Sequence, residues 1–530
     1  MIGVFVLGSM AGCGKQKVED KKMGKEVEKS MKLEEEEKEK HPVVLRLEGG
    51  DWGFPNPFKH YPRGPGGFKT ELVYDSLLEK NEEKEIPWLA KEYTISEDGK
   101  EYIFTLRENA KWHDGTPFTA EDVKFTFDYY RDHPPVWNNL LIDGNYIVEK
   151  AEILNENKVK LIVDEKNTTY LSKIGAVRII PKHIWEKVED PTQYEGDGVG
   201  VGCGPFVLEN YSSEHGSYQF KAFGDYWGPK QKVDGIEYIP VSDSILAFEN
   251  GDIDFLTATP DIVSRYENNS EYKLTQNKPF FGYRLIFNME KRPELKEVAL
   301  RKAIAYGLDR QEMVGKVARG SGIVASMAYL PVEHGWYNEA ITQYTYEPEK
   351  AKELLQGKKY QFELLTGNSP QEVKIAELMK ISLEKVGVQV QIKSVDMKTR
   401  DSAVKAGNYE WVITRHGGWG KDPDSLREHY GITTLKGAGS PASGGIPGYF
   451  NQEINDLCWK QMVQMNPEER RETIFKIQEL VAEEVPMIPL FNTIDIFVTR
   501  PQKFDGWMFR YDHNYMDACK LSYVEREVEE

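Results

Sequence analysis

Apolar side chains recur at two different spacings between residues 43 and 530. Alternation at every second residue is typical of a strand with one buried face, and it predicts strands over residues 43–47, 102–107, 158–163, 235–241 and 283–287. The spacing of an amphipathic helix occurs over residues 119–130, 297–306, 348–355, 371–386 and 467–484. Thr119, Pro348 and Pro467 stand at the starts of three of these helices, where such residues are favoured. Because strands and helices are interleaved, the pattern predicts an α/β or α+β body.

One segment of the body lacks either spacing. Residues 49–67 are crowded with glycine, proline and aromatic side chains. Such a concentration of turn-forming residues disfavours regular structure. We therefore expect a loop over this whole segment.

The first twelve residues are apolar and mostly small, and Cys13 follows them directly. A run of this length is typical of the hydrophobic part of an export signal, and it is too short to span the roughly 30 Å hydrocarbon core of a bilayer. The sequence Met10-Ala11-Gly12-Cys13 resembles a bacterial lipobox. The pattern predicts a lipoprotein signal segment at residues 1–12 and lipidation of Cys13. The alternative is a buried N-terminal strand that ends at an unmodified cysteine.

Residues 13–41 are dominated by Lys and Glu, and they offer almost no apolar surface to bury. Such a composition predicts a solvated, charged tether between a lipid anchor and the folded body. No later run of about 18 apolar residues follows. The expected attachment to the membrane is therefore the lipid alone, and a transport pore would belong to another chain.

Charge and cysteine content narrow the choice of partners. The chain has 68 Lys and Arg against 86 Asp and Glu, a formal charge of -18. A surface of this sign repels phosphate backbones, which argues against a nucleic-acid partner, although acidity can also serve only to keep a protein dispersed. If Cys13 is lipidated, Cys203, Cys458 and Cys519 remain, an odd number that predicts no disulfide framework. We expect a monomer.

Residues 89–107 and 111–123 together form a long sequence motif. Read physically, Asp98-Gly99 and Asp114-Gly115 form turns and Thr119 caps a helix, so the signature is structural. It resembles that of the family-five extracellular solute-binding proteins of peptide and nickel ABC importers. Similar segments follow in the family's order at residues 202–206, 223–227, 248–254, 287–288, 298–310, 347–351, 386–388 and 485–490.

The resemblance implies a two-lobed periplasmic-binding-protein-like α/β fold, type II, of the large class with an extra subdomain. Lobe I would comprise residues 42–278, with the extra subdomain at about 62–200, and residues 489–530 would return to it. Lobe II would comprise residues 279–488. Crossover strands near 279–288 and 485–492 would act as hinges. Such a protein would hold its ligand between the lobes, outside the cytoplasm, and deliver it to the permease subunits of an importer.

The richest candidate for ligand contact is the segment 411–425, in which a hydrophobic strand ends in Arg415, His416 and Trp419 before an Asp-Pro turn. Arg415 could pair with a carboxylate and Trp419 could wall a side-chain pocket. In related peptide binders an aspartate shortly after this tryptophan anchors the peptide amine. Here the spacing is shortened, so either Asp422 serves as the anchor or the anchor is lost.

Related nickel-chelate binders have a histidine three residues before the equivalent tryptophan, and His416 holds that place here. Imidazole suits Ni(II), although a single histidine can equally make a structural hydrogen bond. Trp137 resembles a cleft-lining tryptophan of those binders, and Arg178 is a candidate for binding a carboxylate. Core packing or a surface ion pair is the alternative for each.

Two ligand classes therefore remain open. Short peptides are the first expectation, and a nickel chelate held by His416 is the alternative. No cofactor is expected, since Ni would enter only as part of the ligand. Enzyme motifs such as His-Glu-x-x-His, Gly-x-Ser-x-Gly and the phosphate-binding Gly-x-x-x-x-Gly-Lys-Ser/Thr are missing from the sequence, so we expect a binding protein.

Overall fold

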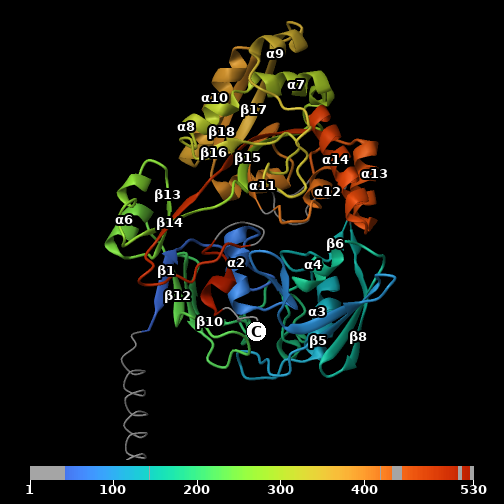
Figure 1. Ribbon diagram of the computed structural model, residues 1–530, viewed down its shortest axis with the longest axis vertical. Helices are drawn as coiled ribbons and strands as arrows, with labels where there is room; N and C mark the ends of the chain where they lie inside the picture. The colour runs from blue at the N-terminus through green and yellow to red at the C-terminus, as the bar shows by residue number, and fades with distance from the viewer. Residues whose placement is uncertain (1–41, 143, 418, 432–444, 511–515, 526–530) are drawn as a thin grey trace, which may run out of the picture. The chain divides into compact units, whose positions relative to one another are not determined.

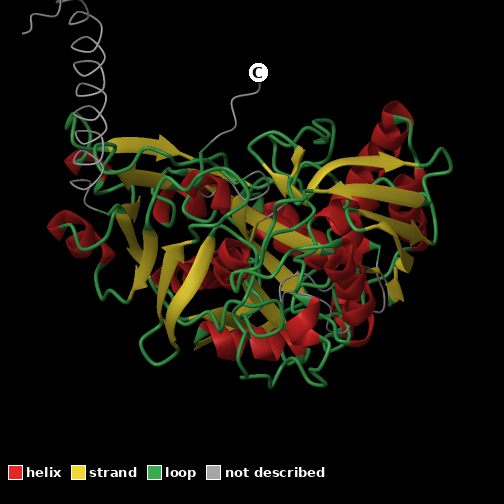
Figure 2. Cartoon of the chain, turned by 90° about the horizontal axis from the view of Figure 1, so that it is seen from below, coloured by secondary structure: helices red, strands yellow, loops and turns green. Residues whose placement is uncertain are grey.

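Helices and strands are interleaved throughout the described part of the chain, which confirms the α/β prediction (Figure 2). The computed structural model describes residues 42–142, 144–417, 419–431, 445–510 and 516–525. Residues 44–530 form one compact unit. The predicted signal segment, Cys13 and nearly all of the tether lie outside the described residues.

The largest sheet has six strands in the order β16-β20-β15-β19-β17-β18. The strands are β15 (Phe281–Phe287), β16 (Gly322–Val324), β17 (Tyr360–Gly367), β18 (Val388–Val395), β19 (Trp411–Gly417) and β20 (Met487–Thr493). The β17 strand pairs in parallel with β18 and β19, whereas β15 runs antiparallel to β19 and β20. A hydrophobic core that extends in sequence from Phe280 to Phe491 surrounds this sheet.

The described residues of the same stretch of chain form eight α-helices, which are labelled in Figure 1. They are α7 (Val298–Gly307), α8 (Arg310–Lys316), α9 (Pro348–Leu355), α10 (Pro370–Glu384), α11 (Met397–Lys405), α12 (Ser425–Tyr430), α13 (Gln452–Val463) and α14 (Pro467–Glu484). Helices α7 and α9 pack together, α10 packs on β17 and β18, and α13 packs on α14. The four helices predicted in this region are confirmed as α7, α9, α10 and α14.

Two further sheets have four strands each. One has the order β1-β12-β11-β10, with β1 (Val44–Glu48), β10 (Phe206–Ser212), β11 (Ser217–Ala222) and β12 (Gly235–Ile239). The other has the order β4-β5-β9-β8, with β4 (Ala90–Ile95), β5 (Glu101–Leu106), β8 (Val148–Asn155) and β9 (Lys158–Val163). Smaller elements are β2 (Leu78–Lys80), β3 (Glu85–Pro87), β6 (Leu141–Ile142), β7 (Asn145–Tyr146), α4 (Tyr170–Gly175) and α5 (Lys182–Trp185).

The family signature folds as a hairpin and a capped helix. Gly99 sits in the turn between β4 and β5 with φ +73°, and Gly115 adopts φ +88° in the second predicted turn. Helix α3 (Ala120–Asp132) begins after Thr119, whose hydroxyl accepts a hydrogen bond from the Glu121 N–H. The Asp122 carboxylate accepts from the Thr119 N–H in return. This capping arrangement explains why the helix starts where the sequence predicts.

A three-stranded sheet of order β13-β21-β14 adjoins the crossovers. It contains β13 (Phe255–Ala258), β14 (Lys273–Gln276) and β21 (Ile496–Thr499), and α6 (Ser244–Asn250) packs against β13. The two crossovers are short connecting segments. Residues 277–280 connect β14 to β15, and residues 494–495 connect β20 to β21. The β20 strand continues through the expected boundary at residues 488 and 489, and the assignment of residues to lobes stays a prediction.

The expectation of a loop over residues 49–67 was wrong at its C-terminal end, because helix α2 (Gly64–Val73) begins there. Pro65 lies in the first turn, where its missing N–H costs no helical hydrogen bond. The glycines that suggested a turn are required by packing instead. A Cβ atom on Gly66 would lie 2.5 Å from the Tyr61 carbonyl oxygen, and one on Gly67 would lie 2.1 Å from the Trp137 ring.

Cys203, Cys458 and Cys519 are buried free thiols. They occupy interior positions and form no disulfide with one another. Burial raises the pKa of Cys458 and Cys519 above the ordinary value, which keeps both thiols protonated at neutral pH.

Candidate functional site

The β19 strand ends at the edge of the six-stranded sheet from which both crossovers leave. Its last residue, Gly417, lies opposite Phe281 at the start of β15. Phe281 in turn lies opposite Thr493 at the end of β20. His416 and Arg415 therefore lie close to both crossovers, as expected for a site next to hinges.

Arg415 is held at this edge by the crossover that follows β20. Its Nη2 donates to Asp495 Oδ2 at 3.2 Å and to Thr493 Oγ1 at 3.4 Å. The guanidinium also lies over the Phe281 ring, 5.0 Å from the ring centroid. About a third of the side chain, 36%, stays exposed, so the group is accessible to a ligand.

His416 and Trp419 belong to an aromatic cluster around Tyr329. The His416 ring stacks on Tyr329 with centroids 5.6 Å apart, and it meets Trp419 edge-on at 5.4 Å. The Trp419 indole is buried, and its N–H has no hydrogen-bond partner among the described residues. The buried indoles of Trp185 and Trp411 share this feature, so it does not by itself mark Trp419 as a ligand donor.

Tyr329 is fixed by a hydrogen-bonded chain beneath the cluster. Arg284 Nη1 donates to the Tyr329 hydroxyl at 2.8 Å, and that hydroxyl lies 3.1 Å from His429 Nε2. Because His429 Nδ1 contacts the Ser425 carbonyl oxygen at 2.7 Å, Nδ1 must carry the proton and Nε2 must accept from Tyr329. Tyr329 adopts φ +73°, an unusual conformation for a bulky residue, and such strain is common at functional sites.

The same chain keeps His429 neutral. Burial, together with the charge of Arg284, lowers the pKa of His429 to about 3. At neutral pH the ring can therefore accept from Tyr329 without carrying a charge. Neither Tyr329 nor His429 was predicted from the sequence, because both lie outside the 411–425 motif and no local pattern marks them.

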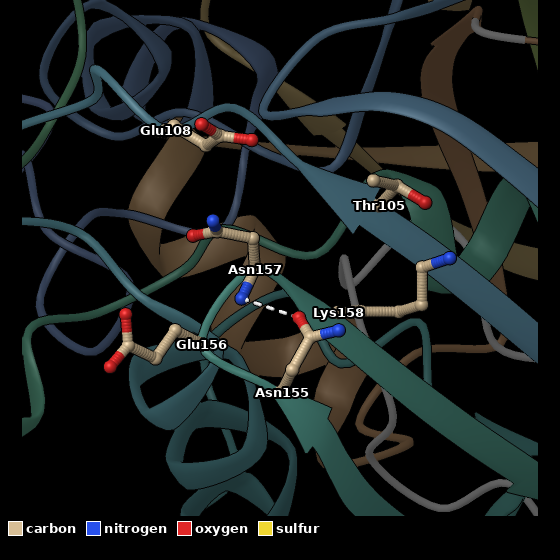
Figure 3. Close-up of a pocket in the computed structure, with 6 residues that line it drawn as sticks. All are labelled: Thr105, Glu108, Asn155, Glu156, Asn157 and Lys158. Atoms are coloured by element: carbon tan, nitrogen blue, oxygen red, sulfur yellow. Dashed lines mark hydrogen bonds between the residues drawn. The ribbon is translucent and has the colours of Figure 1, made fainter.

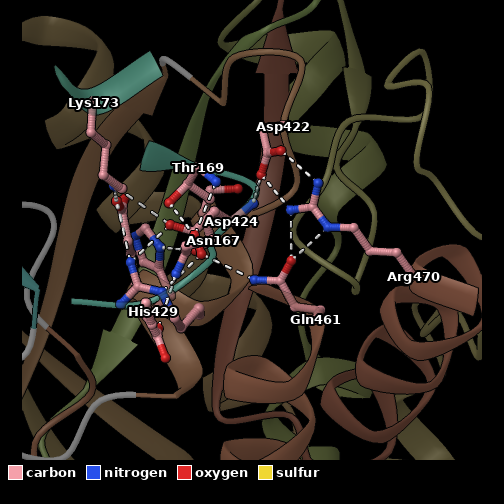
Figure 4. A network of polar contacts seen from close by, with 12 residues as sticks. Asn167, Thr169, Lys173, Asp422, Asp424, His429, Gln461 and Arg470 are labelled. Carbon is pink, nitrogen blue, oxygen red and sulfur yellow. Dashed lines mark hydrogen bonds and ion pairs between the residues drawn. The ribbon is translucent and has the colours of Figure 1, made fainter. Parts of the chain in front are cut away.

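Asp422, the predicted amine anchor, is already bound within the same region. Both of its oxygens accept from the two Nη atoms of Arg470, at 2.7 and 2.8 Å. Figure 4 shows Asp422 and Gln461 on two sides of the Arg470 guanidinium. Bidentate pairs of this kind are strong, so the Asp422 carboxylate is already paired with a residue of α14.

Asp424, two residues further on, lies in a polar network with Lys173 (Figure 4). It also forms an ion pair with the buried Arg427. Burial raises the pKa of the Asp424 carboxyl, but the charges of Arg427 and Lys173 outweigh burial and hold the pKa below its usual range. Lys173 belongs to α4, so the pair connects α4 to the start of α12.

Arg178 and Trp137 take part in packing around α2. Arg178 donates to Ser76 and forms ion pairs with Glu71 and Glu79. Trp137 packs on Gly67 of α2 and meets the His60 ring at 5.3 Å. The structure thus brings His416 and Trp419 together around Tyr329, and it places Arg415 on the other face of β19, beside Phe281 and Asp495. Arg178 and Trp137 are connected to α2 instead.

A separate hollow lies at the turn between β8 and β9 (Figure 3). It is lined by Thr105, Glu108, Asn155, Glu156, Asn157 and Lys158. Backbone hydrogen bonds explain this turn structurally, since the Glu156 carbonyl accepts from Ala120 and the Asn157 carbonyl accepts from Leu106. These hydrogen bonds attach the turn to the start of α3 and to the end of β5.

Two other features are absent from the described residues. No three His, Cys, Asp or Glu side chains gather there as a group that could hold a metal ion. None of the helices in this part of the chain is both long and apolar enough to cross a bilayer.

Comparison with known proteins decides the family. A profile described as "Bacterial extracellular solute-binding proteins, family 5 Middle" matches residues 84–437, more than half of the chain. The chain belongs to the family 5 extracellular solute-binding proteins. As a family 5 member it is the solute-binding component of an ABC importer and not an enzyme. This assignment confirms the resemblance in the sequence.

Family 5 relatives differ in the ligands for which they are named. The heme-binding protein A of Haemophilus influenzae is 25% identical over 84% of this chain and 86% of its own length. The dipeptide-binding protein of Escherichia coli is 24% identical over 76% of this chain and 80% of its own. A Campylobacter jejuni structure in complex with Ni(L-His) has a TM-score of 0.73 at 23% identity, and the match covers 87% of this chain and 94% of that one. This likeness supports the two-lobed fold.

Proposed function

We propose that the protein captures short peptides beside the β19 edge, between its two lobes, and delivers them to the permease subunits of its importer. One observation carries the proposal. The strand register gathers Arg415 and His416 at the sheet edge from which both crossovers leave. A ligand held at such an edge can respond to movement of the hinges, which is how a two-lobed protein encloses its cargo.

The site has the chemistry that a peptide requires. Arg415 is exposed enough to pair with a carboxylate. The partly exposed His416 ring offers aromatic surface to a side chain, and the buried Trp419 indole supports that ring. The Escherichia coli relative named for dipeptide binding supports this choice of ligand. Asp422, Arg178 and Trp137 have structural roles in this proposal, because intramolecular contacts already engage them.

A nickel chelate is the second candidate, and His416 is the observation that favours it. Its ring is partly exposed at the same edge, and neutral imidazole is a good ligand for Ni(II). The similar Campylobacter jejuni protein was crystallised with Ni(L-His). Arg415 would then hold a carboxylate of the chelator, and Ni would be cargo and not a resident cofactor.

We also propose that Cys13 carries a lipid that anchors the protein to the outer face of the cell membrane, with residues 14–41 as the tether. The apolar segment before Cys13 and the charged composition after it support this anchor. We expect the protein to act as a monomer.

Two titrations separate the ligand classes. Intrinsic tryptophan fluorescence is followed while the full chain is titrated with a mixed peptide library, and separately with Ni(II) plus histidine. We expect a saturable change with peptides. A saturable change with nickel-histidine alone would replace the peptide proposal with the nickel one.

Two variants make the same titrations specific. His416→Ala should weaken peptide binding, and under the nickel alternative it should abolish nickel binding. His215→Ala is the matched control, since His215 is exposed on the turn between β10 and β11. Equal peptide binding by the His416 variant, the control and the unaltered protein would remove His416 from the site.

A further inference from the structure

Asp422 and Asp495 are both carboxylates of the region near the β19 edge, and only Asp422 was suggested by the sequence. Asp422 is 42% exposed, but it is held by both Nη atoms of Arg470, and the Arg470 side chain is only 7% exposed. Arg470 also contacts Gln461 through Nε and Nη2. A ligand ammonium that replaced Arg470 would leave a buried guanidinium without its carboxylate, which is unfavourable.

The second carboxylate, Asp495, lies on the crossover between β20 and β21. Its N–H donates to the side-chain oxygen of Asn277 at 2.8 Å, and its carbonyl accepts from the Asn277 N–H at 3.2 Å. Asn277 lies on the other crossover, between β14 and β15. Asp495 is therefore held by its backbone at the point where the two crossovers meet.

The partner of Asp495 can leave at little cost. Arg415 Nη2 contacts Asp495 Oδ2 at 3.2 Å, and the two side chains are 36% and 14% exposed. The Arg415 side chain keeps contact with Phe281 while its head faces solvent in part. Water can solvate the partly exposed Arg415 when it leaves, and the incoming ligand ammonium compensates the mostly buried Asp495.

From this geometry we infer that Asp495 binds the free ammonium group of the ligand, and that Arg415 moves from Asp495 to a carboxylate of the same ligand. The exchange keeps every charge paired, since one carboxylate–guanidinium contact is replaced by two contacts with a ligand that carries both charges. The ligand class is thus a peptide with an unblocked N-terminus. This inference rests on the proposed capture of peptides.

The position of Asp495 also ties recognition to the hinges. Asp495 is bonded to Asn277 on the other crossover, and Arg415 belongs to the last residues of β19. An ammonium on Asp495 would release Arg415 from the crossover, so binding would alter a contact between the sheet edge and a hinge. An ammonium bound at Asp422 would not alter a contact with a hinge. Asp422 pairs with Arg470 within the α12–α14 region, and both residues precede β20 in the chain.

The test compares tripeptides of the form Ala-Xaa-Ala with the same peptides acetylated at the N-terminus. Dissociation constants are measured with the full chain by isothermal titration calorimetry. The unaltered protein should bind the free amines at least about tenfold more tightly. Asp495→Asn should remove that preference by weakening the free amines alone, and Asp495→Glu, which keeps the charge, should retain part of it.

Two further variants complete the design. Asp505→Asn is a matched control, because Asp505 forms an exposed ion pair with Lys273 in the same C-terminal part of the chain. Asp422→Asn tests the competing anchor, and we expect the preference for free amines to survive it. Thermal unfolding of each variant identifies those whose binding loss comes from misfolding.

The outcomes are distinct. Equal binding of free and acetylated peptides by the unaltered protein would overturn the inference and leave peptide capture standing, and this comparison requires no variant. Loss of the preference in Asp422→Asn but not in Asp495→Asn would assign the ammonium to Asp422. If the unaltered protein binds neither set, peptide capture fails and the inference falls with it.

Discussion

Arg63 donates through Nε to Asp401 Oδ2 at 2.7 Å, across 338 residues of sequence. Arg63 is the residue before α2, and Asp401 lies in α11. The Tyr61 hydroxyl also donates to Asp401, at 3.1 Å, and Asp401 is almost completely buried. This contact connects the start of α2 to α11, which packs on the six-stranded sheet.

Breaking this contact should destabilise the folded chain. Arg63→Gln and Asp401→Asn should each lower the free energy of unfolding by about 1–3 kcal/mol, because a buried charge loses its partner. Urea unfolding of both single variants and of the double variant measures the coupling between the two residues. The double variant should lose less than the sum of the single losses. Arg46→Gln, which alters an exposed ion pair with Glu237, is the control; strict additivity would contradict the proposed contact.

The buried Arg301 side chain caps the C-terminal end of α14. It donates to the Glu484 carbonyl at 2.6 Å, to the Val485 carbonyl at 3.0 Å and to the Leu295 carbonyl at 2.7 Å. Val485 ends the helix at φ +49°, an unfavourable angle for a β-branched residue, so this turn depends on its contacts.

We expect Arg301→Gln to lower the free energy of unfolding by roughly 3 kcal/mol, since several buried carbonyl groups lose their donor. The neighbouring variant Lys302→Gln should change it by less than about 0.5 kcal/mol, because Lys302 makes an exposed ion pair with Glu483. Chemical denaturation of the two variants checks the difference. Equal effects would show that the carbonyl contacts contribute little.

His429 should make stability fall on mild acidification. Its pKa is lowered by burial and by Arg284 to about 3 in the folded chain, whereas an unfolded histidine titrates near 6.5. The unfolded chain therefore binds the proton first, and the contribution of His429 is complete above pH 6.5 and declines as the pH falls toward 3. Between pH 7 and pH 5 we expect a loss of about 2 kcal/mol from this residue.

His429→Gln isolates that contribution from other titrating groups. The difference in unfolding free energy between pH 7 and pH 5 should be about 2 kcal/mol smaller in the variant than in the unaltered protein. His183→Gln provides the control, because His183 is half-exposed beside Asp114. An unchanged pH dependence in His429→Gln would mean that the ring is not held neutral.

Local signals predicted much of the fold. Thr119 and Asp122 placed the start of α3, and Asn466 with Pro467 placed the start of α14. Such starts depend on hydrogen bonds within a few residues, so a sequence records them directly. The start of α2 was missed because the need for Gly66 and Gly67 comes from Tyr61 and Trp137, which pack on the helix.

The candidate site was predicted in part for the same reason. Arg415, His416 and Trp419 lie within one strand end, and the motif brought them to notice. The structural partners of Asp422 and Arg178 are distant in sequence, on α14 and on α2, so local pattern gave no sign that these charges are committed. Asp495 was missed because it belongs to a crossover whose meaning depends on the register of β15, β19 and β20.

The cargo itself tests the central claim most directly. The full chain is purified without denaturation from cells grown in rich medium, then unfolded, and the released small molecules are analysed by mass spectrometry, with metal content measured on the same sample. We predict short peptides with free N-termini, close to one per chain, and no stoichiometric metal. Stoichiometric nickel together with a carboxylate chelator, in place of peptides, would contradict the proposal.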